Sequence, residues 1–454
     1  MNEAQLEMEE KLALLKLYLE EEKIENFRLE FLSLHVYEQS QYYLSLTQEE
    51  RQQIYFYLSP REMADMFEIL EEDEESVEIY LKEMDPQYAA DMLSEMYTDN
   101  AVDILNQLDK TDLRKYLNMM TVDNADEIKE LLHYEDETAG SIMTTEYVSV
   151  AATQTISEAM HILKSKALDA ETIYYVYVID IDGKLVGVIS LRDLITRGDD
   201  ELVSDVMGDR PISVNVADDQ NDVAKTIRDY NFLAVPVTDK EEHLLGIITV
   251  DDIIDVIDEE AASDYSGLAG VDVGEQSENP FVAASKRLPW LITLLFLGMG
   301  TATLISRYEV LVSEASILAV FISLITGTAG NAGTQSLAVA VRKLADNDDK
   351  NKNFTRLVIS EVLTGVITGL TTGITIFLVI GIWKHNFILG FVIGTAMLFA
   401  IIVANLAGSL IPILMDRIGF DPAVASGPFI STLSDLTSVL IYFNIAAYFM
   451  NFFI

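Results

Sequence analysis

The chain has 454 residues, enough for about three domains, and no cysteine, which excludes disulfides and thiolate metal sites. Its formal net charge of −44 is unevenly placed: residues 1–283 hold 20 Lys and Arg against 65 Asp and Glu, whereas residues 284–454 hold 10 against 9. An acidic part joined to a nearly neutral, apolar part excludes a purely soluble protein, and the lack of a basic face argues against nucleic-acid binding.

Residues 1–133 are predicted to form an acidic, all-helical domain. The chain starts with an acidic, periodic segment instead of a basic start and an apolar run, so we expect no signal peptide and a cytoplasmic N-terminal part. A five-residue pattern with a central Asp among small and apolar residues recurs at 63–67, 89–93 and 101–105, and more weakly at 124–128. Such irregular repeats predict a helical superhelix. A helical bundle without a binding role is the alternative.

A sharper repeat divides the next part into residues 134–200 and 201–258. The segment Gly-Val-Ile-Ser-Leu-Arg-Asp at 187–193 returns as Gly-Ile-Ile-Thr-Val-Asp-Asp at 246–252. Each copy predicts an α/β unit of helix, strand, turn, strand and helix. The pair resembles tandem CBS domains. In that family the Asp of this segment can bind the ribose of an adenine nucleotide and the Ser or Thr lies near the phosphates, but many pairs bind nothing and serve as dimerisation modules.

From Asp251 an acidic amphipathic helix is predicted to lead toward the apolar part, and residues 259–283 are interpreted as a connecting helix and linker. Ile and Val alternate with Asp and Glu along this segment, which gives the helix one acidic face. A charge run of this kind is usually only a solvated face. Its position, between the α/β pair and the first apolar stretch, is what makes a coupling role worth testing.

Residues 284–454 are predicted to form an all-helical membrane domain, because five apolar stretches are long enough to cross a bilayer. Eight of the ten basic residues fall on one side of these stretches, and only Arg307 and Lys384 fall on the other. Since basic loops stay in the cytoplasm, we expect a multi-pass plasma-membrane protein with its soluble domains inside and its C-terminus outside. The predicted spans are 288–306, 314–340, 355–382, 387–415 and 423–451.

The last span carries the most informative polar residues. Asp435 lies about 12 residues into this span, near the middle of a bilayer, and Pro428, Ser431 and Ser438 share its helical stripe. Because no Lys or Arg lies at comparable depth, the carboxylate is expected to be protonated, hydrated or paired with a visiting cation. A neutral structural Asp bonded to another helix is the alternative.

Two other spans add oxygen ligands to this stripe. The second span places Asn331 and Gln335 one turn apart among glycines, and the fourth contains Asn405. Together the three spans predict an ion path, although helix packing alone also explains the glycines. With no cysteine and only scattered histidines, the path suits a hard cation. Mg²⁺, which gives up its water reluctantly, fits best, and the ligand chemistry leaves Ca²⁺, Mn²⁺ and Na⁺ open.

With these features together, nearly the whole chain resembles the MgtE family of magnesium channels. The most specific segments are Gly-Asn-Ala-Gly-Thr-Gln at 330–335, Asp-Pro-Ala at 421–423, Ser-Gly-Pro at 426–428 with Ser-Asp at 434–435, and residues 137–144. The resemblance implies a homodimer in the lipid bilayer with one pore between the two membrane domains. It further implies that Asp435 binds hydrated Mg²⁺, that Mg²⁺ enters the cytoplasm down its gradient, and that the connecting helix acts as a plug. It implies no enzymatic activity.

The same resemblance implies that cytoplasmic Mg²⁺ bound between the acidic domains holds the dimer shut. The ligands it implies are Asp99, Asp103, Asp219, Asp252, Asp255, Asp264 and Asp421. Asn221, Asn231 and Ser263 stand where acids are expected, so closure is expected to need more Mg²⁺ or to use fewer ions. Ser190, Arg192 and Asp193 match the ATP-contacting segment of the family, which implies ATP as a modulator of closure.

Other classes of function fit the sequence less well. A secondary transporter that couples a divalent cation to H⁺ or Na⁺ is the main alternative, with Asp435 as a proton carrier. An ATP-driven pump would need a GxxxxGK[ST] loop or a DKTG segment, and an intramembrane metalloprotease would need HExxH; the sequence contains none of them. A nucleotide sensor that transports nothing is disfavoured by the mid-membrane Asp435.

Overall fold

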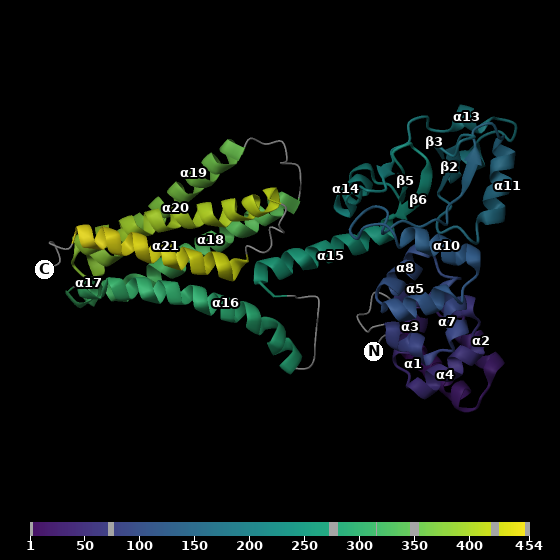
Figure 1. Cartoon of the computed structure of the whole chain (residues 1–454), viewed down its shortest axis with the longest axis horizontal. Coiled ribbons are helices and arrows are strands. Elements are labelled where there is room, and N and C mark those ends of the chain that lie inside the picture. The colour runs from purple at the N-terminus through teal and green to yellow at the C-terminus, as the bar shows by residue number, and fades with distance from the viewer. Residues whose placement is uncertain are drawn as a thin grey trace. The chain divides into compact units, whose positions relative to one another are not determined.

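The computed structural model describes residues 3–70, 77–271, 280–314, 316–345, 354–418 and 426–449. The chain divides into two compact units, Met1–Ile257 and Asp258–Ile454, each of which is described by itself. Figure 1 labels the elements of both. The predicted multidomain fold class is confirmed: helices come first, two small sheets with their helices follow, and long apolar helices form the rest.

The N-terminal domain consists of short amphipathic helices whose apolar sides form one core. Its helices are α1 (Glu3–Glu20), α2 (Ile24–Phe31), α3 (Val36–Leu44), α4 (Gln48–Tyr57), α5 (Pro60–Leu70), α6 (Val77–Glu83), α7 (Pro86–Leu93), α8 (Thr98–Asn106), α9 (Lys110–Leu117) and α10 (Val122–Leu131). Ala64, Ala89 and Ala101, from the repeated pattern, are fully buried. The pattern therefore marks the positions where small side chains let neighbouring helices pack closely.

A buried ion pair joins two of these helices. Arg51 of α4 donates from Nη2 and Nε to the two carboxylate oxygens of Glu83, the last residue of α6, at 2.7 and 2.9 Å. The side chains of Arg51 and Glu83 are only 12% and 6% exposed, and Tyr55 also donates to Glu83 at 3.2 Å. Because the paired fork satisfies both charges, removing one partner leaves an uncompensated buried charge.

We therefore expect Arg51→Met to destabilise the N-terminal domain by about 3 kcal/mol or more. Amide hydrogen exchange of α4 and α6 in the full chain should then accelerate by roughly 100-fold or more. Lys129→Met, which removes an exposed pair with Asp126, is the control and should cost less than about 1 kcal/mol. Unchanged exchange in Arg51→Met would show that the pair contributes no stability.

The two CBS-like repeats have the same topology. Strands β1 (Ser149–Ala151) and β2 (Tyr175–Ile179) are parallel and β3 (Leu185–Ser190) is antiparallel to β2; β4 (Val214–Asn215), β5 (Ala234–Thr238) and β6 (Leu244–Thr249) repeat this order. The accompanying helices are α11 (Ile156–Lys166), α12 (Leu191–Thr196), α13 (Val203–Val206) and α14 (Gln220–Tyr230). A Cβ at Gly246 would lie 2.6 Å from the Thr144 carbonyl oxygen, so this repeated glycine admits a neighbouring segment.

Helix α15 (Val250–Ala269) begins directly after β6 and continues from the first unit into the second without a break at the predicted boundary of 258. It ends at Gly270, whose φ of 66° is the left-handed conformation that suits a helix C-terminus. The predicted linker in part lies outside the described residues, which resume at Pro280.

Among the described residues of the second unit, five helices are long and apolar enough to span a membrane, as predicted. The candidate spans are Pro280–Arg307, Ser316–Leu344, Val358–Trp383, Phe387–Met415 and Gly427–Tyr448. They correspond to the helices α16 (Pro280–Arg307), α18 (Ile322–Ala345) with the preceding 3₁₀ turn η1 (Ser316–Phe321), α19 (Phe354–Trp383), α20 (Phe387–Arg417) and α21 (Gly427–Tyr448); a short helix, α17 (Glu309–Glu314), follows α16.

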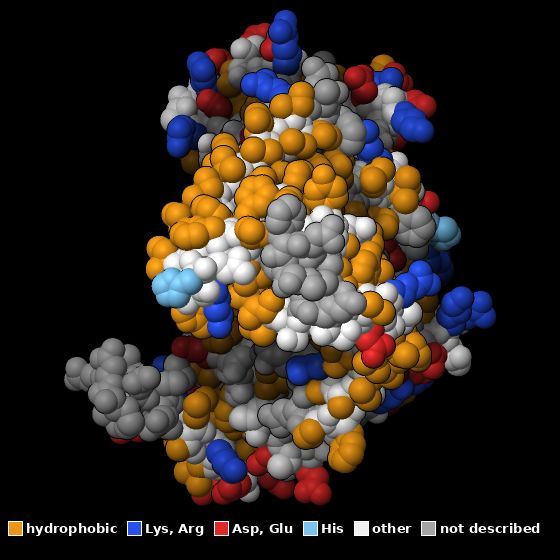
Figure 2. Space-filling model, turned by 90° about the vertical axis from the view of Figure 1, so that its left-hand side faces the viewer, with side chains coloured by type: hydrophobic (Ala, Val, Ile, Leu, Met, Phe, Trp, Pro, Cys, Tyr) orange, Lys and Arg blue, Asp and Glu red, His pale blue; other side chains and the backbone are white. Residues whose placement is uncertain are grey.

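Most span boundaries differ from the prediction by a few residues, and the starts of the first two spans show local reasons. The first helix starts at Pro280, eight residues before the predicted 288, because proline suits the first helical turn and the helix runs on through Pro289. The second span opens with a 3₁₀ turn in place of a regular helix. Figure 2 shows abundant hydrophobic side chains on one face of the structure, and residues such as Leu295, Ile367 and Phe391 are exposed in the second unit. Such a surface is typical of helices that contact lipid.

Candidate functional site

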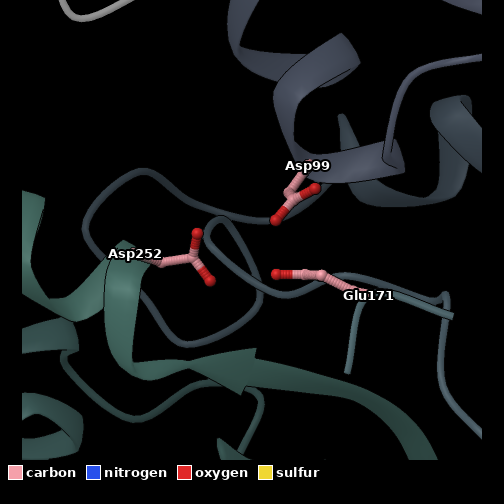
Figure 3. Close-up of side chains that lie close together, drawn as sticks. All are labelled: Asp99, Glu171 and Asp252. Carbon is pink, nitrogen blue, oxygen red and sulfur yellow. The ribbon is translucent and has the colours of Figure 1, made fainter. Parts of the chain in front are cut away.

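Three carboxylates from distant parts of the sequence meet in the first unit (Figure 3). They belong to Asp99 in α8, Glu171 in the loop between α11 and β2, and Asp252 in the first turn of α15, and one oxygen of each lies within 4.8 Å of the others. This spacing allows a single cation to contact all three. We refer to these residues as the carboxylate cluster.

Local structure fixes each side chain of the cluster. Asp99 lies in the first turn of α8, is 5% exposed, and accepts the Asn100 N–H at 2.9 Å. Asp252 accepts the hydroxyl and the N–H of Thr249 at 2.5 and 3.1 Å, which starts α15. The Oε2 atom of Glu171 is buried and accepts no hydrogen bond from the described residues. The cluster therefore retains an acceptor that the surrounding chain does not satisfy.

Burial also makes the ionised cluster unfavourable. Burial, together with the charges of Glu171 and Asp252, raises the pKa of Asp99 well above its usual range. Burial and the Asp252 charge raise the pKa of Glu171 to about 8, and burial raises the pKa of Asp252. Within the described part of the chain, no Lys or Arg forms an ion pair with any of the three. Protons or a cation must offset the charge when the N-terminal domain is docked on the CBS pair.

This arrangement predicts a pH-dependent docking of the empty cluster. Because docking raises the three pKa values, the docked form takes up protons, so it gains stability as pH falls below about 8 and loses it as pH rises through 8. Since the chain has no cysteine, spin labels can be placed at Leu29→Cys and Leu168→Cys, both highly exposed. Without Mg²⁺, the distance distribution between the labels should be narrower at pH 6 than at pH 8.

Glu171→Gln provides the control for this measurement, because it removes the group with the pKa of about 8 and should reduce the pH response. Saturating Mg²⁺ should remove the response in the parent protein, since a bound cation replaces the protons. Identical distributions at both pH values in the absence of Mg²⁺ would contradict the expected proton uptake.

The other predicted regulatory acids occupy varied positions. Asp103 and Asp255 lie about one turn beyond Asp99 and Asp252 on the same helices, Asp255 being exposed. Asp219 is exposed and caps α14 by accepting the Asn221 N–H at 2.8 Å. Asp264 lies on the part of α15 that belongs to the second unit, and Asp421 lies outside the described residues. Their roles as ligands stay predictions.

Glu171 was missed by the sequence reasoning, because it stands alone before a strand and belongs to no repeated segment.

The backbone conformation of Asn231 gives a structural reason for Asn at one of the three positions where the resemblance led us to expect an acid. This residue ends α14 with a φ of 53° and a ψ of 45°, a left-handed conformation that Asn adopts more readily than most side chains. The amide at this position therefore has a backbone role.

In the first CBS repeat, the repeated segment that carries Asp252 in the second repeat lies beside a cavity. The cavity has a volume of about 520 Å³ and is lined by Tyr174, Tyr175, Ser190, Leu191, Arg192, Ile195, Thr196 and Leu233. Beside it, Ser190 donates to Asp193 at 2.5 Å, as Thr249 does to Asp252 in the second repeat. Because Asp251 replaces Arg192 there, the first repeat suits an anionic ligand and the second suits a cation.

A second, smaller cavity of about 190 Å³ shares Tyr175 with the first. Its lining is mainly apolar and includes Tyr177, Pro211 and Phe232. An aromatic and apolar pocket next to a cavity that carries Arg192 is suited to a flat base joined to phosphates.

In the second unit, glycines bring two of the predicted pore spans together. A Cβ at Gly330 would lie 2.8 Å from the Ser431 hydroxyl, and one at Gly333 would lie 3.0 Å from the Ser434 hydroxyl. The backbone of α18 therefore runs directly against α21, the helix that carries Asp435.

The predicted pore-lining residues divide into two groups. Asn331 and Gln335 are exposed on α18, and Pro428, Ser431 and Asp435 are half-buried on α21. Asn405 and Ser438 are buried within the unit, and the Asn405 carbonyl accepts the hydroxyls of Ser336 and Ser409. That these residues line an ion path stays a prediction.

The sequence reasoning also left out Glu361, a buried carboxylate within the third candidate span. It is 9% exposed, accepts the Ser336 hydroxyl at 3.1 Å and lies 3.6 Å from the Lys343 ammonium group. The signal was present in the sequence, since Glu361 is a single acid at the start of a long apolar run. Its partners on α18 make it a polar link between the second and third spans.

Comparison with known families agrees with this division of the chain. A family model described as a divalent cation transporter matches residues 322–445, one described as the MgtE intracellular N domain matches residues 34–137, and the CBS domain model matches residues 139–199 and 203–259. These matches, with five candidate spans, define the class: a multi-pass membrane transporter of divalent cations with a carboxylate-rich part outside the membrane helices.

Similarity to individual proteins is more specific. The chain is 70% identical to the magnesium transporter MgtE of Enterococcus faecalis over 100% of both chains, and 40% identical to that of Bacillus subtilis over 74% of each. The chain belongs to the MgtE family, as its motifs predicted. A crystal structure of the soluble part of a magnesium transporter matches with a TM-score of 0.55 and 63% identity, over 56% of this chain and 100% of the other.

A second solved structure bears on the CBS cavities. The cytosolic domain of the Mg²⁺ channel MgtE in complex with ATP matches with a TM-score of 0.50 and 32% identity, over 54% of this chain and 99% of the other. Neither the matching family models nor these relatives are described as enzymes.

Proposed function

We propose that this protein is a Mg²⁺ channel that admits the ion to the cytoplasm down its electrochemical gradient and is closed by cytoplasmic Mg²⁺. The observation that carries the transport function is the 70% identity over the whole chain to a protein named as a magnesium transporter. The absence of a nucleotide-hydrolysis motif from the sequence supports passive movement.

The carboxylate cluster supports closure by the transported ion. A hard divalent cation prefers oxygen ligands, and the cluster offers three carboxylates that no basic side chain of the described residues neutralises. A cation that binds only when α8, the Glu171 loop and α15 are together stabilises the compact arrangement. Low Mg²⁺ leaves the charges to repel one another and opens the assembly.

The membrane unit supports a pore formed by two copies of the chain. Asn331 and Gln335 are exposed on α18, and Asp435 is only half-buried on the helix that packs against it. Polar groups at the depth of a bilayer need a protein or water partner, which a homodimer with a central path provides. In this proposal Asp435 holds hydrated Mg²⁺ and the soluble domains lie in the cytoplasm.

ATP is proposed as a modulator that binds the first CBS repeat, with phosphates near Ser190 and Arg192 and ribose near Asp193. The similarity to a cytosolic domain solved in complex with ATP and the two adjoining cavities support this assignment. The second repeat is expected to bind no nucleotide, because Asp251 would repel phosphate.

Arg192→Ala should therefore weaken ATP binding to the full chain by about 10- to 100-fold, since a hydrogen bond to a charged group is lost. Isothermal titration calorimetry measures this change and should also give one ATP per chain in the parent protein. Arg197→Ala, which removes an exposed arginine just after the same helix, is the control. Equal affinities for ATP in the two variants would remove Arg192 from the site.

Mg²⁺ flux into proteoliposomes tests the proposal as a whole. The purified chain should pass Mg²⁺ when Mg²⁺ on the side of its soluble domains is low, and it should stop when that concentration is raised. Single-channel currents would support a channel. Flux that appears only with an imposed H⁺ or Na⁺ gradient would instead support the secondary transporter, the second candidate.

A further inference from the structure

We infer that Glu146 is a positioning residue for cation-dependent closure, because it holds the carboxylate cluster together before any cation binds. This inference rests on the proposed closure by Mg²⁺. Glu146 lies in the segment between the N-terminal domain and β1, outside the cluster. Its own bonds reach α8 and the Glu171 loop, and the backbone of Thr144, to which it is bonded, reaches β6, the strand that leads to Asp252.

The Glu146 side chain anchors α8. Its Oε2 accepts the Thr98 N–H at 3.4 Å and its Oε1 accepts the Thr98 hydroxyl. Thr98 is the first residue of α8 and directly precedes Asp99, and the residue before it, Tyr97, provides no side-chain cap. A carboxylate from the CBS side thus serves as the missing cap, where the helix dipole favours negative charge.

The same carboxylate is held firmly by its own segment. Its Oε2 also accepts the Thr144 hydroxyl at 2.5 Å and the Thr145 N–H at 3.1 Å. Thr144 is fully buried, and Thr145 donates from its hydroxyl to Glu127 of α10 at 2.9 Å. The acceptor that α8 meets is therefore fixed in place and is not a mobile surface side chain.

The backbone of this segment reaches the other two cluster residues. The Glu146 carbonyl accepts the Glu171 N–H at 3.0 Å, which sets the loop that carries the Glu171 carboxylate. Thr144 and Ile247 exchange backbone hydrogen bonds of 2.8 and 2.9 Å, and Ile247 belongs to β6, the strand that leads into Thr249 and Asp252. Residues 144–146 thus connect the elements that carry Asp99, Glu171 and Asp252.

At the cluster itself, two contacts of Thr98 link the segment to α8: its bonds to the Glu146 carboxylate and a 3.0 Å hydrogen bond between its hydroxyl and that of Thr145. Loss of the Glu146 carboxylate leaves the Glu171 loop, β6 and the Thr98–Thr145 contact in place, but it removes the cap of α8 and so weakens the hold on Asp99. The cation then has to supply free energy that the Glu146 bonds supplied before. Closure should need more Mg²⁺, whereas the open state, in which the domains are apart, should be unaffected.

The test measures Mg²⁺ flux in proteoliposomes of the full chain against Mg²⁺ on the side of the soluble domains. In Glu146→Ala the Mg²⁺ concentration that halves the flux should rise about tenfold or more, with the maximal flux at low Mg²⁺ unchanged. The midpoint of Glu146→Gln, which keeps one acceptor oxygen, should lie between those of the parent protein and Glu146→Ala. Glu158→Ala is the control, because Glu158 caps only its own helix through Thr155 and should leave the midpoint unchanged.

A double-mutant cycle separates this role from general destabilisation. Thr98→Val should raise the midpoint several-fold, Thr98→Ser should restore it, and Thr98→Val combined with Glu146→Ala should raise it by less than the product of the two single effects. Additive effects of the two changes, or a wild-type midpoint in Glu146→Ala, would overturn the inference.

Failure of the proposed function is distinguishable from failure of this inference. If Mg²⁺ does not close the parent protein, the proposed function fails, and the spin labels at positions 29 and 168 still test the positioning role. Glu146→Ala should broaden the distance distribution between them at saturating Mg²⁺, whereas Glu158→Ala should not. An unchanged distribution in Glu146→Ala would overturn the inference on this second readout.

Discussion

Asp435→Asn is expected to lower Mg²⁺ flux through the reconstituted protein by about 100-fold or more. The substitution keeps the size of the side chain and removes its negative charge on the helix α21. A divalent ion that crosses a low-dielectric region depends strongly on a nearby carboxylate, because Coulomb attraction there is several times stronger than in bulk water. The measurement is Mg²⁺ uptake by proteoliposomes at low Mg²⁺ on the side of the soluble domains.

Glu309→Gln is the matched control, because it neutralises an exposed acid on α17, outside the candidate spans. Its flux should remain within about twofold of the parent protein. If Asp435→Asn also retained that flux, the last span would carry no selectivity site, and the ion path would have to lie along other helices of the second unit.

The architecture was predictable from periodic features of the sequence. The number of candidate spans follows from uninterrupted apolar length, and the CBS pair follows from one segment that returns at 246–252. The start of the first span was not predictable in the same way. Lys286 and Arg287 interrupt the apolar pattern, yet hydrogen bonding within the helix continues through them from Pro280.

The cluster was only partly predictable, because its members come from three different local contexts. Asp99 and Asp252 were identified through the family resemblance, whereas Glu171 belongs to a loop with no pattern of its own. The same limit applies to Glu146. Its role depends on a hydrogen bond to Thr98, 48 residues earlier in the chain, and periodicity carries no information about such contacts.

The repeat also places one local motif in two surroundings of opposite charge. Ser190 with Asp193 and Thr249 with Asp252 form the same bond at the start of a helix. The difference lies in the neighbours: Arg192 lines a cavity in the first repeat, and the carboxylates of Asp99 and Glu171 surround Asp252 in the second. The motif fixes the backbone at the start of the helix, and the residues around it give the two sites opposite charge.

Asp99→Asn combined with Asp252→Asn is expected to leave the protein conducting at millimolar Mg²⁺, where we expect the parent protein to be closed. The two substitutions remove two of three carboxylates that surround the proposed cation, and one remaining carboxylate binds a divalent ion weakly. The Mg²⁺ concentration that halves the flux should rise by about 100-fold or more, or closure should disappear. Maximal flux at low Mg²⁺ should not exceed that of the parent protein.

Two effects of this double substitution oppose each other. Neutral amides remove the repulsion that keeps the empty cluster apart, which favours docking, and they also remove the free energy of cation binding, which opposes it. At low Mg²⁺ the loss of repulsion can only reduce the difference in flux between low and high Mg²⁺. At millimolar Mg²⁺ the loss of cation binding decides the outcome, because in this proposal only the parent cluster is occupied by Mg²⁺.

The control for this prediction is Asp126→Asn with Asp229→Asn, which removes the same charge from one exposed site in each domain. If closure depended on overall acidity, the control would shift the midpoint as much as the cluster variant does. A shift confined to the cluster variant would instead assign the sensor to Asp99 and Asp252. Closure of the cluster variant at the Mg²⁺ concentration of the parent protein would place the sensor elsewhere.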